Sequence, residues 1–355
     1  MTRSCCAVLA SLCVLAGATG PRAGAQTGGA PRLDVTAHPS DRRVEVLVDG
    51  QPFTAYIWPE RLAKPVLYPI RSAAGTLVTR GFPLEPRAGE RVDHPHHVGF
   101  WFNHGDVNGV DFWNNSETLK PEERARMGSI RQVAIQSAKG GSGHGELKVA
   151  VDWVMPDGSA AIREQTAFGF GAGAGRRSID RDTTLTANAR RVVFSDNKEG
   201  TLGLRVTRAL EEPSKEPLVF TDASGKPTAV PAMDNATANG TYTSSEGVTG
   251  AAVWGTRARW VALSGRVAGE DVVLLMLDHP KNPGYPSYWH ARGYGLFAAN
   301  PLGAKVFSNG KEQLNLAIEP GRSVRFQHRL LILSGPFSAD RAEAAWNEFA
   351  SEAAR

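Results

Sequence analysis

Hydrophobic and polar residues alternate along several long stretches of the chain. In RVEVLV at 43–48, valine occupies every second position. Successive side chains of a β-strand point to opposite faces, so this period of two predicts a strand with one buried face. The same pattern predicts strands at 129–136, 146–154, 162–170, 178–186, 202–207 and 323–333.

Other stretches have different patterns. Residues 272–277, VVLLML, are continuously apolar and predict a strand that is buried on both faces. The apolar residues of 342–349 are spaced i, i+3, i+4 and i+7, which predicts a helix with Ser338 as its N-cap. The glycine-rich stretch 169–175 lies between predicted strands and indicates a hairpin turn, and 222–247 has the composition of a long surface loop.

Many strands at short spacing, without alternating helices, predict an all-β fold. We expect a large antiparallel β-sandwich with a short C-terminal helix. By analogy with proteins of similar size, its two sheets should form the supersandwich of the galactose-mutarotase-like fold.

The first residues have the pattern of a secretory signal. Arg3 precedes an apolar stretch at 7–17, and Ala23-Gly24-Ala25 fits a signal peptidase site. We therefore expect residues 1–25 to be a cleaved signal peptide, 26–355 to be a single domain, and the protein to be periplasmic or secreted. All three cysteines, Cys5, Cys6 and Cys13, lie in this segment, so the mature chain has no cysteine with which to form a disulfide or a thiolate site.

The net charge and the hydropathy of the mature chain argue against nucleic acid and a membrane span. The signal holds two of the 40 basic residues and no acid, which leaves 38 basic against 36 acidic residues, or a net charge of +2. So small a balance does not favour nucleic acid as a partner. No later stretch approaches 18 consecutive apolar residues, so we expect no membrane span in the mature chain.

Four of the nine histidines lie within eleven positions, in DHPHHVGFWFNHGDVNGVDFW at 93–113. Pro95 has no N–H to donate and is unfavourable inside a strand, so His94 and His96 should lie on a loop before a strand that begins near His97. Alternation along this strand would place His97, Gly99, Trp101 and Asn103 on one face, and Val98, Phe100 and Phe102 in the core.

Three kinds of site fit this cluster. Histidine and carboxylate groups serve acid–base catalysis, and they also bind metals. Indole rings beside polar groups suit sugar binding. A fourth interpretation is a buried polar network that orders the loops.

Two further segments carry candidate partners for this cluster. Residues 278–301 follow the predicted buried strand as a proline-rich loop, which restricts its conformations. Glu85 and Arg80 precede the histidines; Glu85 is the best placed carboxylate for an acid or base role there, and an ion pair with a nearby arginine is the alternative. We expect residues 80–113 and 279–300 to line one pocket.

Two blocks of the sequence resemble a known family. Residues 64–113 and 278–303 are similar to the family labelled "methane oxygenase PmoA". The resemblance implies a carbohydrate substrate, through that family's association with sugar-processing and exported carbohydrate enzymes. The methane chemistry of the label does not carry over, since that subunit is an integral membrane protein and no spanning helix is expected here.

The sequence therefore predicts an exported enzyme that acts on a carbohydrate or related polyhydroxylated small molecule. The reaction would be hydrolysis, elimination or epimerisation by acid–base chemistry. The candidate catalytic residues are His96, His97, Glu85, Asp93, Asp106 and His290. The candidate substrate-binding residues are Arg80, His94, Trp101, His104, Asp111, Trp113, His279, Tyr288, Trp289, Arg292 and Asn300.

Two alternatives remain open. A metalloenzyme, such as an oxygenase, would hold a divalent metal ion with His96, His97 and one carboxylate. A non-catalytic carbohydrate-binding protein would need the aromatic rings but not the titratable groups. The small-molecule or oligosaccharide ligand itself is not identified by the sequence.

Overall fold

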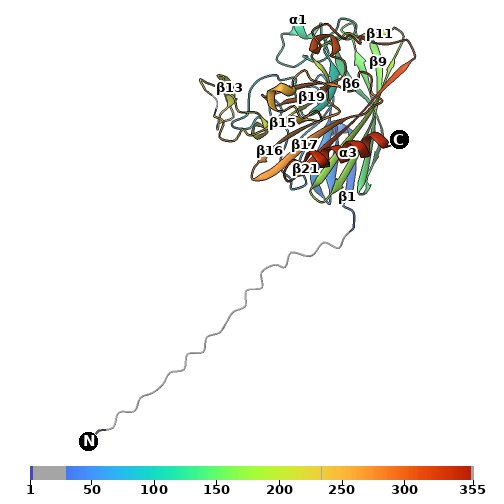
Figure 1. The fold of residues 1–355 in the computed structure, drawn as a ribbon. Coiled ribbons are helices and arrows are strands. Elements are labelled where there is room, and N and C mark those ends of the chain that lie inside the picture. Colours follow the sequence, from blue (N-terminus) through green and yellow to red (C-terminus); the bar gives the residue numbers. More distant parts are fainter. Residues whose placement is uncertain (3–28, 233, 353–355) are drawn as a thin grey trace.

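The protein is a sandwich of two large antiparallel sheets, described by a computed structural model that covers residues 1–2, 29–232 and 234–352 (Figure 1). The nine-stranded sheet has the order β18 (Tyr288–Arg292), β19 (Leu296–Asn300), β12 (Gly200–Arg205), β5 (Phe100–His104), β4 (Val66–Leu67), β3 (Gln51–Ile57), β2 (Arg43–Val48), β1 (Arg32–His38), β7 (Gly141–Ser142). The eight-stranded sheet has the order β15 (Thr241–Ser244), β16 (Trp260–Val267), β17 (Glu270–Asp278), β21 (Ser323–Ser334), β10 (Arg176–Ala187), β9 (Ala160–Gly173), β8 (His144–Val154), β6 (Ser129–Lys139).

The smaller elements connect and cover these sheets. Two short antiparallel pairs join β11 (Val192–Phe194) to β20 (Leu316–Ile318) and β13 (Leu218–Thr221) to β14 (Pro227–Val230). The α-helices are α1 (Pro121–Arg124), α2 (Ala304–Phe307) and α3 (Ala339–Ser351), and the 3-10 helices are η1 (Pro39–Asp41), η2 (Arg208–Leu210) and η3 (Gly250–Val253). The predicted all-β sandwich with a C-terminal helix is therefore confirmed.

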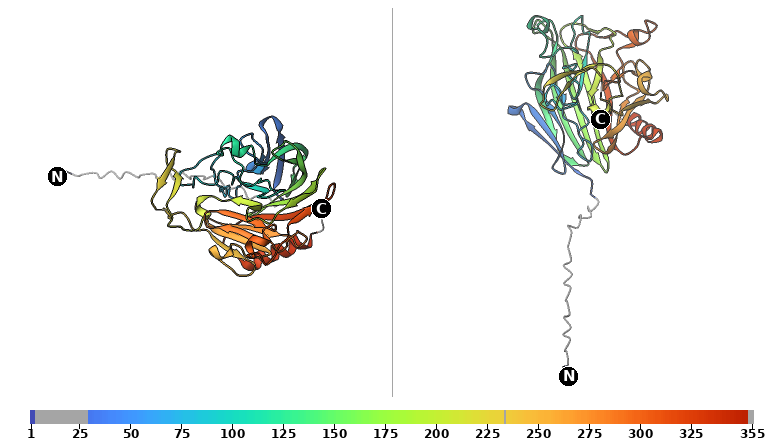
Figure 2. Two further views of the ribbon diagram at one scale, coloured as in Figure 1. Left: turned by 90° about the horizontal axis from the view of Figure 1, so that it is seen from above. Right: turned by 90° about the vertical axis from the view of Figure 1, so that its left-hand side faces the viewer.

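The alternating pattern of the strands builds the core between the sheets. In β2, Val44, Val46 and Val48 are buried, while the intervening residues are partly exposed. The inner faces of both sheets meet in one continuous hydrophobic cluster. Figure 2 shows the two layers, with β1, β2 and β3 in one and β16, β17 and β21 in the other.

The apolar strand β17 is buried on both faces, as predicted, because α3 covers the outer face of its sheet. Leu274 and Met276 face the core between the sheets. Val273, Leu275 and Leu277 instead pack under α3. Ser338 caps this helix, accepting a hydrogen bond of 3.4 Å from the backbone N–H of Arg341.

Two local predictions need correction. Residues 222–247, expected to be a loop, contain β14 and the edge strand β15, which pairs with β16. The strand expected near His97 begins at Phe100, because the backbone turns at His94–His97 and Gly99 has a φ of 58°, outside the strand region. The glycine-rich stretch 169–175 does end in the turn between β9 and β10, as predicted.

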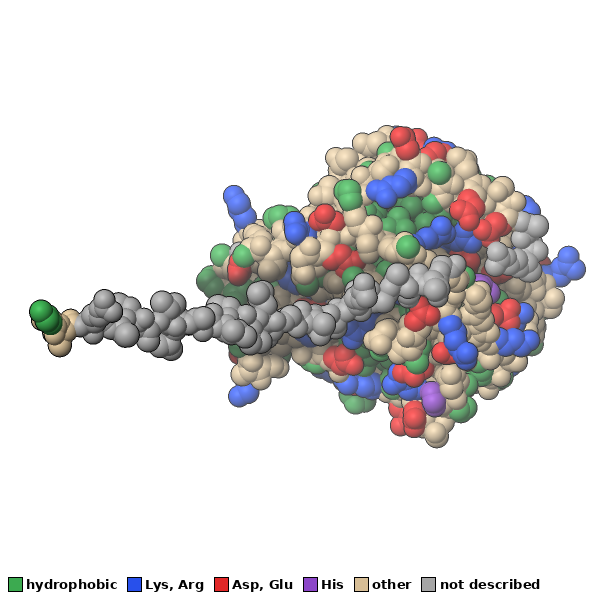
Figure 3. Space-filling view, turned by 90° about the horizontal axis from the view of Figure 1, so that it is seen from below, with side chains coloured by type: hydrophobic (Ala, Val, Ile, Leu, Met, Phe, Trp, Pro, Cys, Tyr) green, Lys and Arg blue, Asp and Glu red, His purple; other side chains and the backbone are tan. Residues whose placement is uncertain are grey.

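Among the described residues, none of the helices has both the length and the hydropathy needed to cross a membrane. On the face shown in Figure 3, basic and acidic side chains are interspersed among the described residues. The predicted segment 1–25 lies almost wholly in residues 3–28, outside the described part of the chain.

Candidate functional site

The candidate site lies on the outer face of the nine-stranded sheet, away from the core between the sheets. In β5, Phe100 and Phe102 face that core, whereas Trp101 packs in a separate cluster on the outer face. Trp101 lies over Gly203 of β12, where an added Cβ would be 2.4 Å from the indole ring. Arg205 has the same parity as Gly203, so its side chain rises from the same face.

A tight turn presents the three neighbouring histidines differently. The backbone N–H of His97 donates to the carbonyl of His94 at 2.9 Å, and Pro95 lies within this turn. His94 and His96 remain partly exposed, whereas His97 is only 1% exposed. The turn therefore separates two accessible imidazoles from one that belongs to the interior.

Two buried arginines fix the carboxylate of Asp93. The side chains of Arg80 and Arg205 are 0% exposed, and both donate to Oδ1 of Asp93, Arg205 at 2.7 Å. Arg80 also donates to the carbonyls of His94 and His97, at 3.0 and 3.1 Å. Burial raises the pKa of Asp93, but Arg205, His94 and Arg80 together hold it well below its ordinary range.

His94 is oriented by this carboxylate and by two flat rings. Its Nδ1 lies 3.0 Å from Oδ2 of Asp93, and its side chain is 40% exposed. The imidazole is parallel to the rings of His97 and Tyr294, with centroids 4.8 Å away in each case. Since Nδ1 faces Asp93, Nε2 is the nitrogen that remains available to a ligand.

His97 and His96 are neutral imidazoles. His97 stacks on Trp101 at 5.3 Å, and its Nδ1 accepts from Arg205 at 3.3 Å. Burial, His96 and Arg205 lower the pKa of His97 well below its ordinary value. Burial, with Lys64 and His94, lowers the pKa of His96 to about 2. Both rings have low proton affinity at neutral pH, which disfavours the proton-transfer roles predicted for them.

Lys64, which the sequence analysis did not select, holds the turn at His94–His97 through a hydrogen bond. Its Nζ donates to the carbonyl of His96 at 2.7 Å and lies 5.3 Å from the centre of the Trp101 ring. Burial lowers the pKa of Lys64 to about 7, against the charge of Asp111. A buried amine next to the histidines is thus ionised only in part at neutral pH.

The second predicted segment reaches the cluster through its turn. Tyr294, between β18 and β19, stacks on His94, and the guanidinium of Arg205 lies 4.9 Å from the Tyr294 ring centre. The exposed Arg292 lies 5.8 Å from the same ring. Residues from both predicted segments therefore meet at His94.

His290 of β18 adds a buried imidazole to this face. Its Nδ1 is 3.9 Å from Oε2 of Glu199, a residue that the sequence analysis did not select. Burial, with the charges of Lys198, Arg292 and His94, lowers the pKa of His290 to about 3. The ring is therefore neutral at neutral pH, next to a partly exposed carboxylate.

Other residues of the second segment have structural positions. Trp289 is fully buried in the core, and its indole N–H donates to the carbonyl of Ala258 at 3.0 Å. Asn300 donates to the carbonyls of Asn197 and Lys198, which orders that loop. Both side chains therefore make structural hydrogen bonds.

Tyr288 and His279 also lie away from the histidine cluster. The ring of Tyr288 packs against Arg257 and Phe307. His279 follows β17 in the other sheet, where its ring lies 5.2 Å from Phe349 of α3. The predicted single pocket is therefore wrong for His279, because β17 belongs to the opposite layer.

Three candidates from the first segment hold local backbone structure. Asp106 accepts from the backbone N–H of Gly109 at 2.9 Å, and Asp111 accepts from that of Trp113 at 2.7 Å. His104 is fully buried, with Nε2 2.8 Å from the carbonyl of Ser195. The two aspartate contacts are typical of turns, and His104 is held through Nε2, while its Nδ1 is buried without a hydrogen-bond partner among the described residues.

Glu85 and Trp113 lie at the border of the cluster, Glu85 exposed and Trp113 buried. Glu85 accepts from the Tyr68 hydroxyl at 3.1 Å and has no ion pair in the described part of the chain. Trp113 is fully buried, with its ring 5.3 Å from that of Trp101 and 5.5 Å from that of His97. Trp101 and Trp113 thus form the floor beneath the histidines.

Within the described residues, no group of three or more His, Cys, Asp or Glu side chains is arranged to hold a metal ion. His96 and His97 meet edge to face at 4.3 Å between ring centres, and the nearest carboxylate of the cluster, Asp93, is occupied by arginines. His96, His97 and a carboxylate therefore do not form a set of metal ligands among the described residues.

Comparison with known proteins identifies a family but no activity. Residues 43–347 match the family described as "Family of unknown function (DUF6807)". The expected membership in the family labelled methane oxygenase PmoA is therefore wrong, because the match is to a family of unknown function. No curated protein matches the sequence.

Several solved structures are similar to this chain at a low level. The GH36 α-galactosidase AgaB from Geobacillus stearothermophilus has a TM-score of 0.37 and 9% identity over 85% of this chain, which spans only 41% of the length of that enzyme. The Slr1438 protein from Synechocystis sp. PCC 6803 has a TM-score of 0.33 and 10% identity, with 87% and 99% of the two chains covered. A galactose mutarotase related enzyme from Lactobacillus acidophilus has a TM-score of 0.28 and 7% identity, with 86% and 97% covered. Scores this low support no statement about activity.

Proposed function

The chain belongs to the family of unknown function DUF6807, and we propose that it is an exported enzyme that acts on a carbohydrate or related polyhydroxylated small molecule by acid–base chemistry. The proposed site is the outer face of the nine-stranded sheet, around His94. Export rests on the sequence pattern of the first 25 residues, and sequencing the N-terminus of the mature protein from the periplasm or medium tests it.

The observation that supports this proposal best is the pairing of His94 with Asp93. Oδ2 of Asp93 lies 3.0 Å from Nδ1, at ion-pair distance but outside hydrogen-bond geometry. A carboxylate this close favours a proton on Nδ1, which leaves the Nε2 lone pair to accept a proton from a substrate. Asp93 also stabilises the imidazolium that forms. Arg80 and Arg205 keep the carboxylate in place through its other oxygen, Oδ1. Asp93 is thus a positioning residue, and His94 is the group that touches the substrate.

The surroundings of His94 supply the other parts of an acid–base site. Tyr294 and His97 hold the imidazole plane by parallel stacking. Glu199 is a partly exposed carboxylate beside His290, and we assign it the second acid–base role, in place of the proton-transfer roles predicted for His96 and His97. The exposed Arg292 would orient substrate oxygens. Hydrolysis, elimination and epimerisation all use two such groups.

The test is turnover of a panel of neutral and acidic mono- and oligosaccharides in D2O, followed by proton NMR. Hydrolysis releases new reducing ends, elimination gives an unsaturated sugar, and epimerisation exchanges a carbon-bound proton for deuterium. We expect one of these products with the unmodified protein, and a rate at least about 100-fold lower for His94→Gln. His144→Gln is the matched control, because His144 is exposed on β8 in the other sheet.

Equal turnover by His94→Gln and the unmodified protein would refute the proposed site. Tight binding of a saccharide without any product would instead favour the non-catalytic carbohydrate-binding protein.

A further inference from the structure

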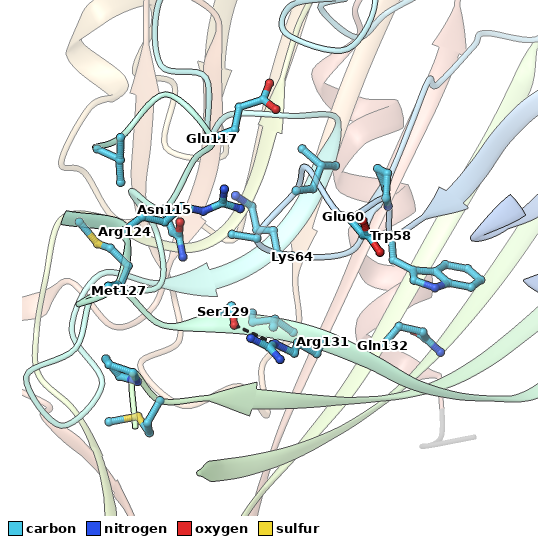
Figure 4. Close-up of a pocket in the computed structure, with 18 of the residues that line it drawn as sticks. Trp58, Glu60, Lys64, Asn115, Glu117, Arg124, Met127, Ser129, Arg131 and Gln132 are labelled. Carbon is cyan, nitrogen blue, oxygen red and sulfur yellow. Dashed lines mark hydrogen bonds between the residues drawn. The ribbon is translucent and has the colours of Figure 1, made fainter. Parts of the chain in front are cut away.

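A large cleft opens beside the histidine cluster. Its volume is about 800 Å³, and its walls come from residues 58–64, the segment around α1 and the start of β6. Figure 4 shows Trp58 at one end of the cleft and Met127 at the other, with Lys64 and Arg131 between them. Several sugar units fit into a space of this size.

The charged groups of the cleft are unbalanced. Its lining has four basic side chains and two acidic ones, a difference of +2: Arg42, Lys64, Arg124 and Arg131 against Glu60 and Glu117. Both acids are already paired, Glu60 with Arg42 and Glu117 with Arg61, at 2.5 Å in each case. In the described part of the chain, the other three basic groups, Lys64, Arg124 and Arg131, form no ion pair.

The two arginines are the cations that a ligand in the cleft can reach. Within the described residues, the side chain of Arg131 donates a weak hydrogen bond of 3.4 Å to Ser129, shown as a dashed line in Figure 4. Lys64 is buried and already donates to the carbonyl of His96. An anionic ligand would therefore supply the missing partners.

The cleft shares a wall with a cavity of the histidine cluster. A small cavity, lined by His96, Pro95 and Arg61, shares Lys64 and Glu117 with the cleft. The Arg61–Glu117 pair lies at the junction and links the two segments that form the walls. His96 thus lies in a cavity next to the cleft, and its ring is 5.7 Å from that of His94.

The remaining walls suit sugar rings. Trp58 is partly exposed and is held by Tyr56, with ring centres 5.5 Å apart. Leu62 and Met127 add apolar surface. The cleft thus combines an aromatic platform with unpaired cations.

We propose that this cleft binds an anionic oligosaccharide, whose carboxylate or sulfate groups lie against Arg124 and Arg131. This inference rests on the proposed function, because it names the substrate class of the site at His94. Guanidinium groups pair with planar or tetrahedral oxyanions through two parallel hydrogen bonds, which favours an acidic sugar over a neutral one.

Calorimetric titration tests this inference directly. The probes are an oligogalacturonate of four units, a sulfated oligosaccharide of four units and a neutral gluco-oligosaccharide of the same length. We expect at least one anionic probe to bind about tenfold tighter than the neutral one. Its affinity should fall as NaCl rises from about 50 to 500 mM, since added salt screens exposed charges. The stronger anionic probe identifies carboxylate or sulfate as the natural group.

Arginine variants locate the binding. Arg124→Gln and Arg131→Gln should each weaken the anionic probe by about tenfold and leave the neutral probe unchanged. Arg322→Gln, an exposed arginine between β20 and β21, is the control and should change neither affinity.

Equal affinity for neutral and anionic probes, no binding of any probe, or full anionic affinity in the Arg124→Gln/Arg131→Gln double variant would each overturn the inference. Turnover is scored separately. Binding that depends on these arginines, without a product that depends on His94, would leave the inference standing and refute the proposed acid–base function.

Discussion

Replacing Asp93 by asparagine should destabilise the protein, because the change leaves two buried guanidinium groups without their shared counter-charge. The side chains of Arg80 and Arg205 are 0% exposed, and that of Asp93 is 17% exposed. Asparagine keeps the shape and one acceptor oxygen but not the charge. Removing one partner of a buried ion pair costs about 3–5 kcal/mol of unfolding free energy.

The lower end of this range applies here. Asp93 is partly exposed, and the charge of Glu211 also acts on Arg80. We therefore expect a loss of about 3 kcal/mol. With an unfolding entropy of roughly 2 cal/mol/K per residue over roughly 320 folded residues, the Tm should fall by about 5 °C.

Thermal unfolding at pH 7, followed by circular dichroism, measures this change. Asp34→Asn is the matched control, since Asp34 forms an exposed pair with Arg32, and its loss should cost less than about 1 kcal/mol. A Tm for Asp93→Asn within about 1 °C of the unmodified protein would refute the buried-charge argument.

The pH dependence gives a second check on Asp93. Its pKa is lower in the folded protein, so its contribution is fully present above the ordinary value of about 4 and is lost as the pH falls below it. The difference between the two proteins should therefore narrow from pH 5 to pH 2. A constant difference over this range would contradict the depressed pKa.

Three further changes test other parts of the account. Gly203→Ala places a Cβ 2.4 Å from Trp101, so it should lower the unfolding free energy by about 1–3 kcal/mol and change the near-ultraviolet spectrum. Gly173→Ala is the control and should be neutral, because an added Cβ there has no atom within 4 Å. Equal effects of the two changes would contradict the packing of Trp101 on Gly203. Burial lowers the pKa of Lys64 to about 7, below its value in the unfolded chain. The unmodified protein should therefore gain stability relative to Lys64→Met as the pH rises from 7 to 10. A difference in denaturant midpoint that stays constant over this range would contradict the lowered pKa. Ser338→Ala removes the N-cap of α3 and should cost about 1 kcal/mol by the same assay, and no loss would show that the cap is not stabilising.

The pattern of hydrophobic and polar residues predicted the sandwich because the alternation that buries one face of a strand can be read from neighbouring residues. Alternation along 43–48 corresponds to strand β2, and the apolar run at 272–277 corresponds to β17, covered on its second face by α3. The start of β5 was misplaced because Pro95 and Gly99 set backbone angles that hydrophobicity does not report.

Only part of the candidate site could be predicted in the same way. The sequence drew attention to Asp93 and His94 because they are close neighbours in a histidine-rich stretch. It did not select Arg205 or Tyr294, whose contacts with them join positions more than 100 residues apart and depend on the pairing of β5, β12 and β19. Trp289 looked like a stacking platform, but alternation in β18 turns it to the core and leaves His290 on the outer face.

Nitrogen NMR of the histidine rings tests the central claim most directly. The protein, labelled with 15N at histidine and assigned with single His→Gln variants, would be titrated with the saccharide that gives the highest turnover. We predict that the Nε2 signal of His94 moves most, with smaller shifts at His96. Shifts confined to His144, His279 and His328, which line a pocket on the eight-stranded sheet, would place the ligand in the opposite layer and contradict the account.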